Sequence, residues 1–452
     1  MNSPGQRPPN ILLLLPDQWR RDWTGLPDGV GIDTPNIVRL ADRGSRFTNA
    51  FCPSPLCAPA RACLASGLEY HRTGVRSNAQ NYPIELPTFY ARLRDAGYSV
   101  LGCGKFDLHK PEYTWGPDGS HLLGEWGFTG GIDSEGKIDG IAAWNRSTPG
   151  PYLSYLSRRG VVQAYVDDME LRRGANSLAT HLSPLDDQDY GDNWVTRNAL
   201  ELLSEADQSR PWFLQVNFPG PHGPFDVTPK MNEWCRDTRM PDAVACDHDS
   251  TAVQRTRRAY SAMCRNIDER IGDLTKWLES THQLDNTVVI FSSDHGEMLG
   301  DHDRWGKNRA LTPSLGVPLV MAGPGIPTGQ TVTRAVSNLD ITATILSAAD
   351  LPVPAGIDSV SLLEARGRLR TFDPTARPIT AALEEGKNSW RCALDDDYKL
   401  VVHAEGTTEL FAYRDDVHEM ENLVAARPEV VARLERALPP SVESPSGHRP
   451  TE

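Results

Sequence analysis

Three unbroken runs of apolar residues recur along the chain, and polar residues follow each of them. The runs lie within residues 10–17, 212–218 and 287–294. Continuous apolar runs of this length are typical of strands that are buried on both faces of a sheet, whereas half-exposed strands alternate apolar and polar residues. The pattern therefore predicts three central strands.

The segments between these runs show the periodicity of helices. The clearest is 259–279, in which apolar residues from Met263 to Leu278 form one stripe. Two further helix-like segments are 88–96 and 194–206. Strands that alternate with helices predict an α/β fold with a mostly parallel sheet.

The polar residues that follow the strands are of kinds that bind ligands. Asp17 and Gln18 follow the first run, Asp294 and His295 end the third, and His222 follows the second closely. In parallel sheets ligands bind beyond the carboxyl ends of the strands, so these side chains predict a site. An aspartate after a strand can equally be a turn former or a helix cap, and this pattern alone does not choose between the two.

The composition changes beyond Leu363, where a charged and irregular stretch precedes short strand-like runs and one final helix. Strands followed by a single helix predict a small antiparallel α+β subdomain. The expected divisions are a main domain at 1–365, the subdomain at 366–440 and a disordered tail at 441–452. The strand-like runs are 379–383, 390–394, 399–403 and 409–413, and the helix is 428–438.

Composition and charge narrow the classes of function. The 452 residues are 39% hydrophobic and 23% charged, which is ordinary for a globular protein. The net charge of −14 argues against nucleic-acid and anionic-membrane partners, because both require a basic surface. The apolar run 11–15 is too short for a signal peptide or a membrane span, so we expect a cytoplasmic protein with no membrane partner. There the eight cysteines, which form no CxxC pair, are expected to be reduced.

The segment CAPARACLASG, residues 57–67, combines a helix start with reactive side chains. Pro59 suits the first turn of a helix, where its missing N–H does no harm. Cys57 would then lie at the helix N-terminus, where free N–H groups favour an anion, and Arg61 would follow one turn later on the same face. The pattern fits a thiolate nucleophile or an ordinary helix start with buried thiols.

The Cys-x-Pro-x-Arg pattern resembles the signature of type I sulfatases, members of the alkaline phosphatase superfamily. The closest match to that family is SDHGEMLGDH at 293–302 with WGK at 305–307. The resemblance implies an alkaline-phosphatase-like α/β sandwich around a large, mostly parallel sheet, with a small C-terminal antiparallel α+β subdomain. Further matching segments, in the family's order, are NILLLLPDQ at 10–18, GKFDLH at 104–109, PHGPF at 221–225, VPL at 317–319 and LDITATIL at 339–346.

The resemblance also implies a chemistry. In the family a formylglycine-generating enzyme oxidises the cysteine, here Cys57, to formylglycine, whose hydrate attacks the sulfur of a sulfate ester. One divalent cation would polarise a sulfate oxygen and lower the pKa of the hydrate. The implied metal ligands are Asp17, Gln18, Asp294, His295 and residue 57. The other implied catalytic residues are Arg61, Lys105, His109, His222 and Lys307.

The metal motif departs from the commonest family pattern. Gln18 stands where many members have aspartate, and His295 stands where many have asparagine. The combination resembles the branch of choline sulfatases and phosphonate monoester hydrolases. We expect Ca²⁺ from the broad family, with Mn²⁺ as the alternative because imidazole suits a transition metal. Asp301 and His302 are expected to be loop residues rather than a second metal site.

Two further departures concern the catalytic residues. Asp107 stands where the family motif GKxHL has histidine, and His109 follows two residues later. We expect His109 in the active site, with Asp107 as the alternative. Ala60 replaces the usual serine, but the cysteine, proline and arginine that form the core of the conversion signal are all present.

The expected reaction is hydrolysis of a sulfate monoester of a small molecule or a saccharide. A phosphonate monoester or phosphodiester hydrolase on the same scaffold is the nearest alternative. A non-catalytic anion- or metal-binding protein is the third, and it would require that Cys57 stays unconverted. We expect the organic part of the substrate to be bound by loops at 115–188 and 230–250, whose tryptophans could stack on a ring: Trp126, Trp144 and Trp234.

Overall fold

A computed structural model describes residues 8–174, 178–364, 369–370 and 377–440. Its centre is an eight-stranded sheet in the order β4-β3-β5-β1-β6-β7-β2-β8. β7 runs antiparallel to both of its neighbours and every other neighbouring pair is parallel, so the predicted α/β fold with a mostly parallel sheet is confirmed. The strands are β1 Asn10–Leu14, β2 Gly44–Phe51, β3 Ser99–Gly104, β4 Gly130–Asp133, β5 Trp212–Asn217, β6 Thr287–Ser292, β7 Leu319–Ala322 and β8 Gln330–Ser337.

The continuous apolar run of β1 follows from its central place in the sheet. Every residue of β1 is buried, and side chains alternate between the two faces. Leu12 and Leu14 pack into the core on one face, whereas Ile11 and Leu13 pack into the core on the other. Both faces are covered by helices, so neither set of side chains needs to be polar.

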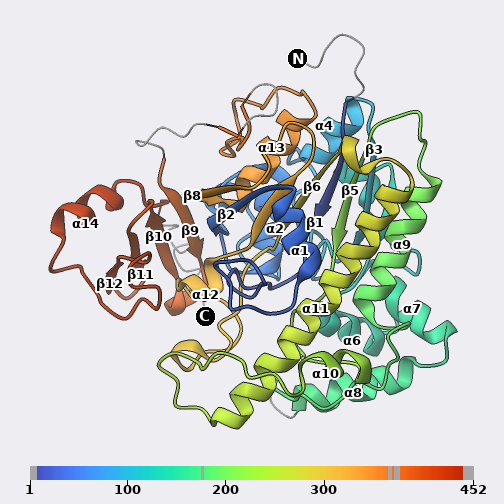
Figure 1. The fold of residues 1–452 in the computed structure, drawn as a ribbon, viewed down its shortest axis with the longest axis horizontal. Coiled ribbons are helices and arrows are strands. Elements are labelled where there is room, and N and C mark those ends of the chain that lie inside the picture. The colour runs from blue at the N-terminus through green and yellow to red at the C-terminus, as the bar shows by residue number, and fades with distance from the viewer. Residues whose placement is uncertain (1–7, 175–177, 365–368, 371–376, 441–452) are drawn as a thin grey trace, which may run out of the picture.

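The two faces carry different helices (Figure 1). α1, α9 and α11 contribute apolar side chains to the core that contains Leu12, and α2, α4 and α13 contribute to the core that contains Ile11. The helices are α1 Pro35–Asp42, α2 Cys57–Ser66, α3 Tyr70–Thr73, α4 Phe89–Asp95, α5 Leu123–Trp126, α6 Lys137–Asn145, α7 Pro151–Arg158, α8 Val162–Gly174, α9 Gly191–Glu205, α10 Pro229–Cys235, α11 Ser250–Ser280, α12 Thr312–Leu315, α13 Ile341–Ala348 and α14 Pro428–Glu435.

A separate four-stranded antiparallel sheet lies at the C-terminal end, coloured orange to red in Figure 1. α14 packs on it through Leu434, which meets Leu400 and Leu410 in a small core. This confirms the predicted C-terminal α+β unit. The boundary proposed near residue 365 and the tail at 441–452 stay predictions, because 365–368, 371–376 and 441–452 lie outside the described residues. The strands, in the order β12-β11-β10-β9, are β9 Ile379–Leu383, β10 Trp390–Leu394, β11 Lys399–His403 and β12 Thr408–Phe411.

One expectation about the organisation is wrong. Residues 115–188 were expected to be loops, yet they contain β4 and the helices α5 to α8, because their apolar residues pack as helix faces on the main core. Trp126 is buried, and Trp144 and Trp234 pack against the core. In 230–250, α10 covers the first residues and the remainder as far as Asp249 forms neither helix nor strand.

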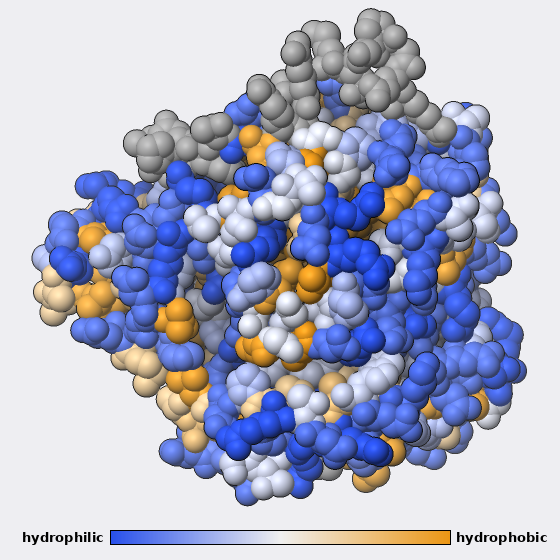
Figure 2. Space-filling view, viewed as in Figure 1, coloured by the Kyte–Doolittle hydropathy of each residue, from blue (hydrophilic) through white to orange (hydrophobic). Residues whose placement is uncertain are grey.

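The surface in Figure 2 is mainly hydrophilic on the face shown, with hydrophobic side chains gathered in small separate patches. Across the described ranges, no helix is both long enough and apolar enough to cross a membrane.

A buried carboxylate after β4 predicts a pH dependence of stability. Glu135 accepts hydrogen bonds from the backbone N–H groups of Leu153 at 2.8 Å and Tyr152 at 3.4 Å, and burial raises its pKa to about 7. Because this pKa lies above the ordinary value of 4.5, the folded protein binds the proton more tightly than the unfolded chain between these pH values. The contribution of Glu135 to the free energy of unfolding should therefore fall by about 2.5 kcal/mol as pH rises from 5 to 8.

Urea denaturation of the wild type and Glu135→Gln at pH 5, 6, 7 and 8 measures this contribution. The difference between the two proteins should change with pH in the stated direction. Glu201→Gln, at an exposed position of α9, should leave the wild-type pH profile unchanged. Equal slopes in the wild type and Glu135→Gln would contradict the prediction.

Candidate active site

The candidate residues converge because four neighbouring parallel strands deliver them to one edge of the sheet. β3, β5, β1 and β6 are adjacent in that order. Lys105 follows β3, His222 follows β5, Asp17 follows β1 and Asp294 follows β6. All four side chains therefore lie at the carboxyl ends of strands, where ligands bind in such sheets.

α2 brings Cys57 to the same edge. The helix begins at Cys57, has Pro59 in its first turn and ends at Gly67, whose φ of 73° is the left-handed conformation that glycine adopts readily. All ten residues of α2 are buried. The predicted helix start is thus confirmed, and residue 57 lies where the helix N-terminus favours negative charge.

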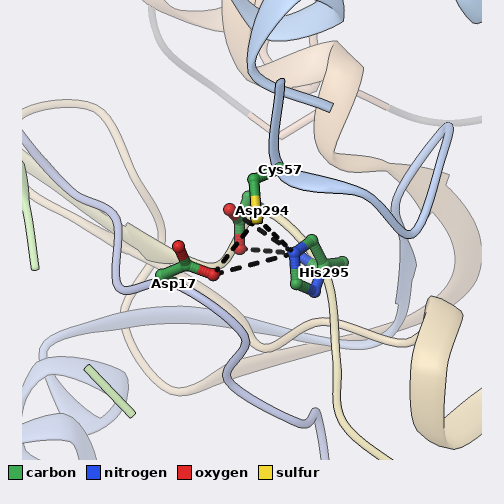
Figure 3. A group of neighbouring side chains, drawn as sticks. All are labelled: Asp17, Cys57, Asp294 and His295. Carbon is green, nitrogen blue, oxygen red and sulfur yellow. Dashed lines mark hydrogen bonds and ion pairs between the residues drawn. The ribbon is translucent and has the colours of Figure 1, made fainter. Parts of the chain in front are cut away.

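Cys57 lies in a compact group with Asp17, Asp294 and His295, shown in Figure 3. One possible ligand atom of each residue lies within 4.8 Å of the others, and all four residues are buried. The Cys57 Sγ is 3.4 Å from His295 Nε2 and 3.7 Å from Asp17 Oδ1. Two carboxylates, an imidazole and residue 57 at this spacing can hold one metal ion.

Gln18 adds a further candidate ligand. Its backbone adopts a φ of 70°, its N–H donates to Asp294 Oδ1 at 2.9 Å, and its amide Nε2 donates to Glu297. Its Oε1 is buried and has no hydrogen-bond partner. A buried acceptor without a partner is costly, and a cation at this position would satisfy it. The donor set therefore fits a divalent metal ion.

Arg61 joins several parts of the cluster. Its Nε donates to Asp294 Oδ2 at 2.9 Å, and its guanidinium also contacts the Lys105 carbonyl at 2.5 Å and the Asn217 Oδ1 at 3.3 Å. The Asp17 Oδ2 is 3.8 Å away. Arg61 thus neutralises carboxylates that follow two different strands and holds α2 to the strand ends.

Two lysines contact residues of the cluster. Lys307 Nζ is 2.8 Å from Cys57 Sγ and 3.2 Å from His295 Nε2. Lys105 contacts Asp17 and lies 2.8 Å from Asp107 Oδ2. Both ammonium groups also line the cavity described below, so they place positive charge beside residue 57 and Asp17.

The strand that carries Lys105 ends in a glycine for a steric reason. Gly104 has a φ of 102°, and a Cβ there would lie 2.0 Å from the Asn217 carbonyl oxygen of β5. Only glycine permits this approach, which sets the direction in which Lys105 leaves the sheet.

Electrostatics favour an anion at residue 57. Burial raises the pKa of the Cys57 thiol, but Lys105 and Lys307 outweigh burial and hold the pKa well below 9.0. Burial also opposes ionisation of Asp17, yet the same lysines and His222 lower its pKa. At Cys63, burial dominates and raises the pKa, as expected of a packing residue.

Of the two predicted histidines that remain, one lines the active-site cavity and the other does not. His222 lines the cavity described below, on a loop where Gly220 N–H donates to Asp192 Oδ1 at 2.9 Å. His109 is not brought into the cluster: its Nε2 lies 3.2 Å from Glu112, and its ring stacks on that of His121. These contacts of the imidazole lie outside the cluster, whereas the alternative residue, Asp107, contacts Lys105.

Asp301 has a structural role, as expected. It accepts from Arg20 at 2.6 Å and from Arg257 at 2.7 Å. In the part of the chain that the structure describes, the group around Cys57 is the one cluster of three or more metal-capable side chains.

A cavity of about 480 Å³ opens over the cluster. Asp17, Lys105, His222 and Lys307 line its inner end. Lys110, which no motif of the sequence singles out, also lines the cavity, and its Nζ lies 3.0 Å from Asp107. The spacing of three residues between Asp107 and Lys110 is the feature of the sequence that could have indicated this ion pair. The other lining residues are Asn78, Ala79, Pro111, Tyr113, Gly136, Lys137, Ile138, Asp139, Arg146 and Pro219.

The family model for sulfatases matches residues 9–351, which include every strand of the large sheet and the whole cluster. The chain belongs to the sulfatase family. It is therefore a sulfuric ester hydrolase of the alkaline phosphatase superfamily, as the resemblance implied.

Two curated relatives are enzymes named for sulfate esters. The choline-sulfatase of Rhizobium meliloti (strain 1021) is 31% identical over 438 residues, covering 88% of this chain and 81% of its own. The arylsulfatase of Clostridium perfringens (strain 13 / Type A) is 26% identical over 463 residues, covering 92% and 90%.

Solved structures share the fold. The phosphonate monoester hydrolase of Agrobacterium radiobacter superposes with a TM-score of 0.78 at 23% identity, covering 95% of this chain and 94% of its own. BT4656, solved in complex with D-glucosamine-2-N,6-O-disulfate, gives a TM-score of 0.76 at 20% identity, covering 95% and 96%.

The position of Lys307 predicts a large effect on turnover. Lys307→Gln removes a positive charge in contact with residue 57 and should lower kcat for an aryl sulfate by about 100-fold or more. Lys387→Gln, at an exposed position in the C-terminal unit, is the matched control and should keep the wild-type rate. Steady-state kinetics measure both, and a rate for Lys307→Gln within a few-fold of the control would refute this role.

Proposed function

We propose that this sulfatase hydrolyses a sulfate monoester with a formylglycine made from Cys57 and one divalent cation. The observation that carries the proposal is the position of Cys57, at the start of a buried helix and in contact with His295 and Lys307. That position supplies an anion site, a metal site and positive charge around one side chain.

Asp17, Gln18, Asp294 and His295 would hold the cation together with residue 57. When bound, the cation supplies Lewis acidity toward a sulfate oxygen and toward the oxygen nucleophile of formylglycine. Ca²⁺ is our first assignment and Mn²⁺ the alternative, because the set combines carboxylate and amide oxygens with one imidazole nitrogen.

The remaining side chains have roles that follow from their charges. Lys105, Lys307 and His222 would bind the sulfate oxygens, where negative charge is concentrated during transfer. Arg61 holds Asp294 in place through its 2.9 Å contact and keeps the nucleophile side of the site positive. For the position that the family fills with histidine, Asp107 is the better candidate than His109, because Asp107 orients Lys105.

Sulfate is preferred to phosphonate as the substrate group because the curated relatives are named choline-sulfatase and arylsulfatase. The phosphonate monoester hydrolase that shares the fold is 23% identical. A phosphonate monoester is the second candidate, since it presents a similar tetrahedral anion to the same cations. A cytoplasmic location and a transient encounter with a formylglycine-generating enzyme remain predictions.

The test is the ratio of kcat/KM for an aryl sulfate to that for an aryl phosphonate monoester. The protein is co-expressed with a formylglycine-generating enzyme, and mass spectrometry of the tryptic peptide 47–61 verifies conversion of Cys57. We expect a ratio well above one and no turnover by Cys57→Ala, whose fold should be intact. A ratio well below one would establish a phosphonate hydrolase. Activity retained in Cys57→Ala would refute the proposed nucleophile.

Removal of one ligand tests the metal site independently of turnover. Gln18→Leu deletes the buried amide oxygen and should weaken binding of Ca²⁺ or Mn²⁺ by at least about 10-fold. Calorimetric titration of the metal-stripped protein measures each affinity. Gln163→Leu, at an exposed position of α8, is the control, and equal affinities in the two variants would remove Gln18 from the ligand set.

A further inference from the structure

The cavity continues well beyond the inner end at which sulfate would bind. A volume of about 480 Å³ exceeds what a sulfate group fills and lies in the range of small-molecule sites. Its outer wall is built by the segment that follows Asp107 and by α6. We define the outer wall as Lys110, Tyr113, Lys137, Ile138, Asp139 and Arg146.

The two lysines of the outer wall are already neutralised by carboxylates. Lys110 Nζ lies 3.0 Å from both Asp107 Oδ2 and Asp139 Oδ2. Lys137 Nζ lies 2.6 Å from Asp226 Oδ1. These ion pairs shape the wall but leave little positive charge available for a substrate.

Arg146 differs from these lysines. It is the C-cap residue of α6, it is exposed, and its guanidinium forms neither an ion pair nor a hydrogen bond with any residue in the described ranges. Its Cζ lies over the ring of Tyr113, 4.4 Å from the ring centroid. Stacking holds the planar guanidinium in place while its N–H donors remain free, an arrangement suited to a carboxylate or a sulfate.

We propose that the organic part of the substrate carries a second anionic group, a carboxylate or a second sulfate, that binds Arg146. The proposal rests on the proposed function, because it assigns the far end of the same substrate. It also predicts that this chain disfavours a cationic alcohol such as the one for which its choline-sulfatase relative is named. A cationic alcohol would meet the free charge of Arg146, and the ring of Tyr113 is already covered by that guanidinium.

The charge of the whole protein strengthens this assignment. The chain carries a net charge of −14, so an anionic substrate is not attracted by the surface in general. Arg146, an exposed cation on the lining of this cavity that is unpaired among the described residues, supplies local attraction. The same arrangement excludes cationic competitors by repulsion.

Three aryl sulfates test the proposal: phenyl sulfates with a carboxylate, a carboxamide or a trimethylammonium group at the meta position. For the converted enzyme, kcat/KM for the carboxylate should exceed that for the carboxamide by about 10- to 100-fold. Arg146→Gln should remove this preference, mainly through KM, and should leave the carboxamide unchanged. Ratios between enzyme variants cancel the differences in leaving-group reactivity.

Arg158→Gln, at an exposed position of α7 outside the cavity lining, is the matched control and should keep the wild-type preference. A phenylene disulfate in place of the carboxylate shows which of the two anions binds better. Calorimetric binding of the carboxylate and carboxamide esters to Cys57→Ala, with and without Arg146→Gln, repeats the comparison without turnover.

The outcomes separate the two proposals. Turnover without an anion preference, or a loss in Arg146→Gln that is equal for all esters, would overturn the role of Arg146 and leave the proposed function intact. Preferred turnover of a phosphonate over any sulfate would overturn the proposed function. The binding comparison would then still decide whether Arg146 recognises an anion.

Discussion

The active site depends on the balance of buried charge between Arg61 and the carboxylates Asp17 and Asp294. Each carboxylate follows a central strand and is buried, where an unpaired charge would be strongly destabilising. Arg61, itself buried, contacts both, and α2 carries it into place only because residue 57 begins that helix at the same edge. The charge balance and the position of Cys57 are therefore one structural feature.

The buried charges and hydrogen-bonding groups of the site do not all have partners within the part of the chain that the structure describes. Lys307 contacts residue 57 and Lys105 contacts Asp17 beside it, and together the two lysines hold the pKa of the Cys57 thiol well below 9.0 despite burial. The cluster also leaves the Oε1 of Gln18 without a partner. A cation between the acidic side chains and an anion beside the lysines would complete both sets of contacts, which is the arrangement that the proposed function requires.

Much of this organisation could be predicted from the sequence, because strand burial and local motifs carry it. The unbroken run around Leu12 identified a central strand, and Pro59 identified the start of α2. The helices in 115–188 could not be predicted from the same patterns, since their apolar faces are short and acquire meaning only by packing on the main core. His109 shows a related limit: Asp107 fills the motif's histidine position, and the sequence does not reveal that His109, two residues later, contacts Glu112 and stacks on His121.

Arg146 shows why substrate specificity is harder to predict than the reaction. The residues that we propose to bind the metal and the sulfate lie after strands or at the start of α2, whose places in the fold are fixed, so motifs identify them. Arg146 instead is the C-cap residue of α6, in a segment without a recognisable motif, and its proposed role in binding follows from its neighbours in the folded structure. The neighbouring lysines are paired with carboxylates, whereas Arg146 is stacked on Tyr113 with its donors free. The strand ends can thus fix the residues of the reaction, while a residue at a helix terminus on the cavity lining determines which substrate binds.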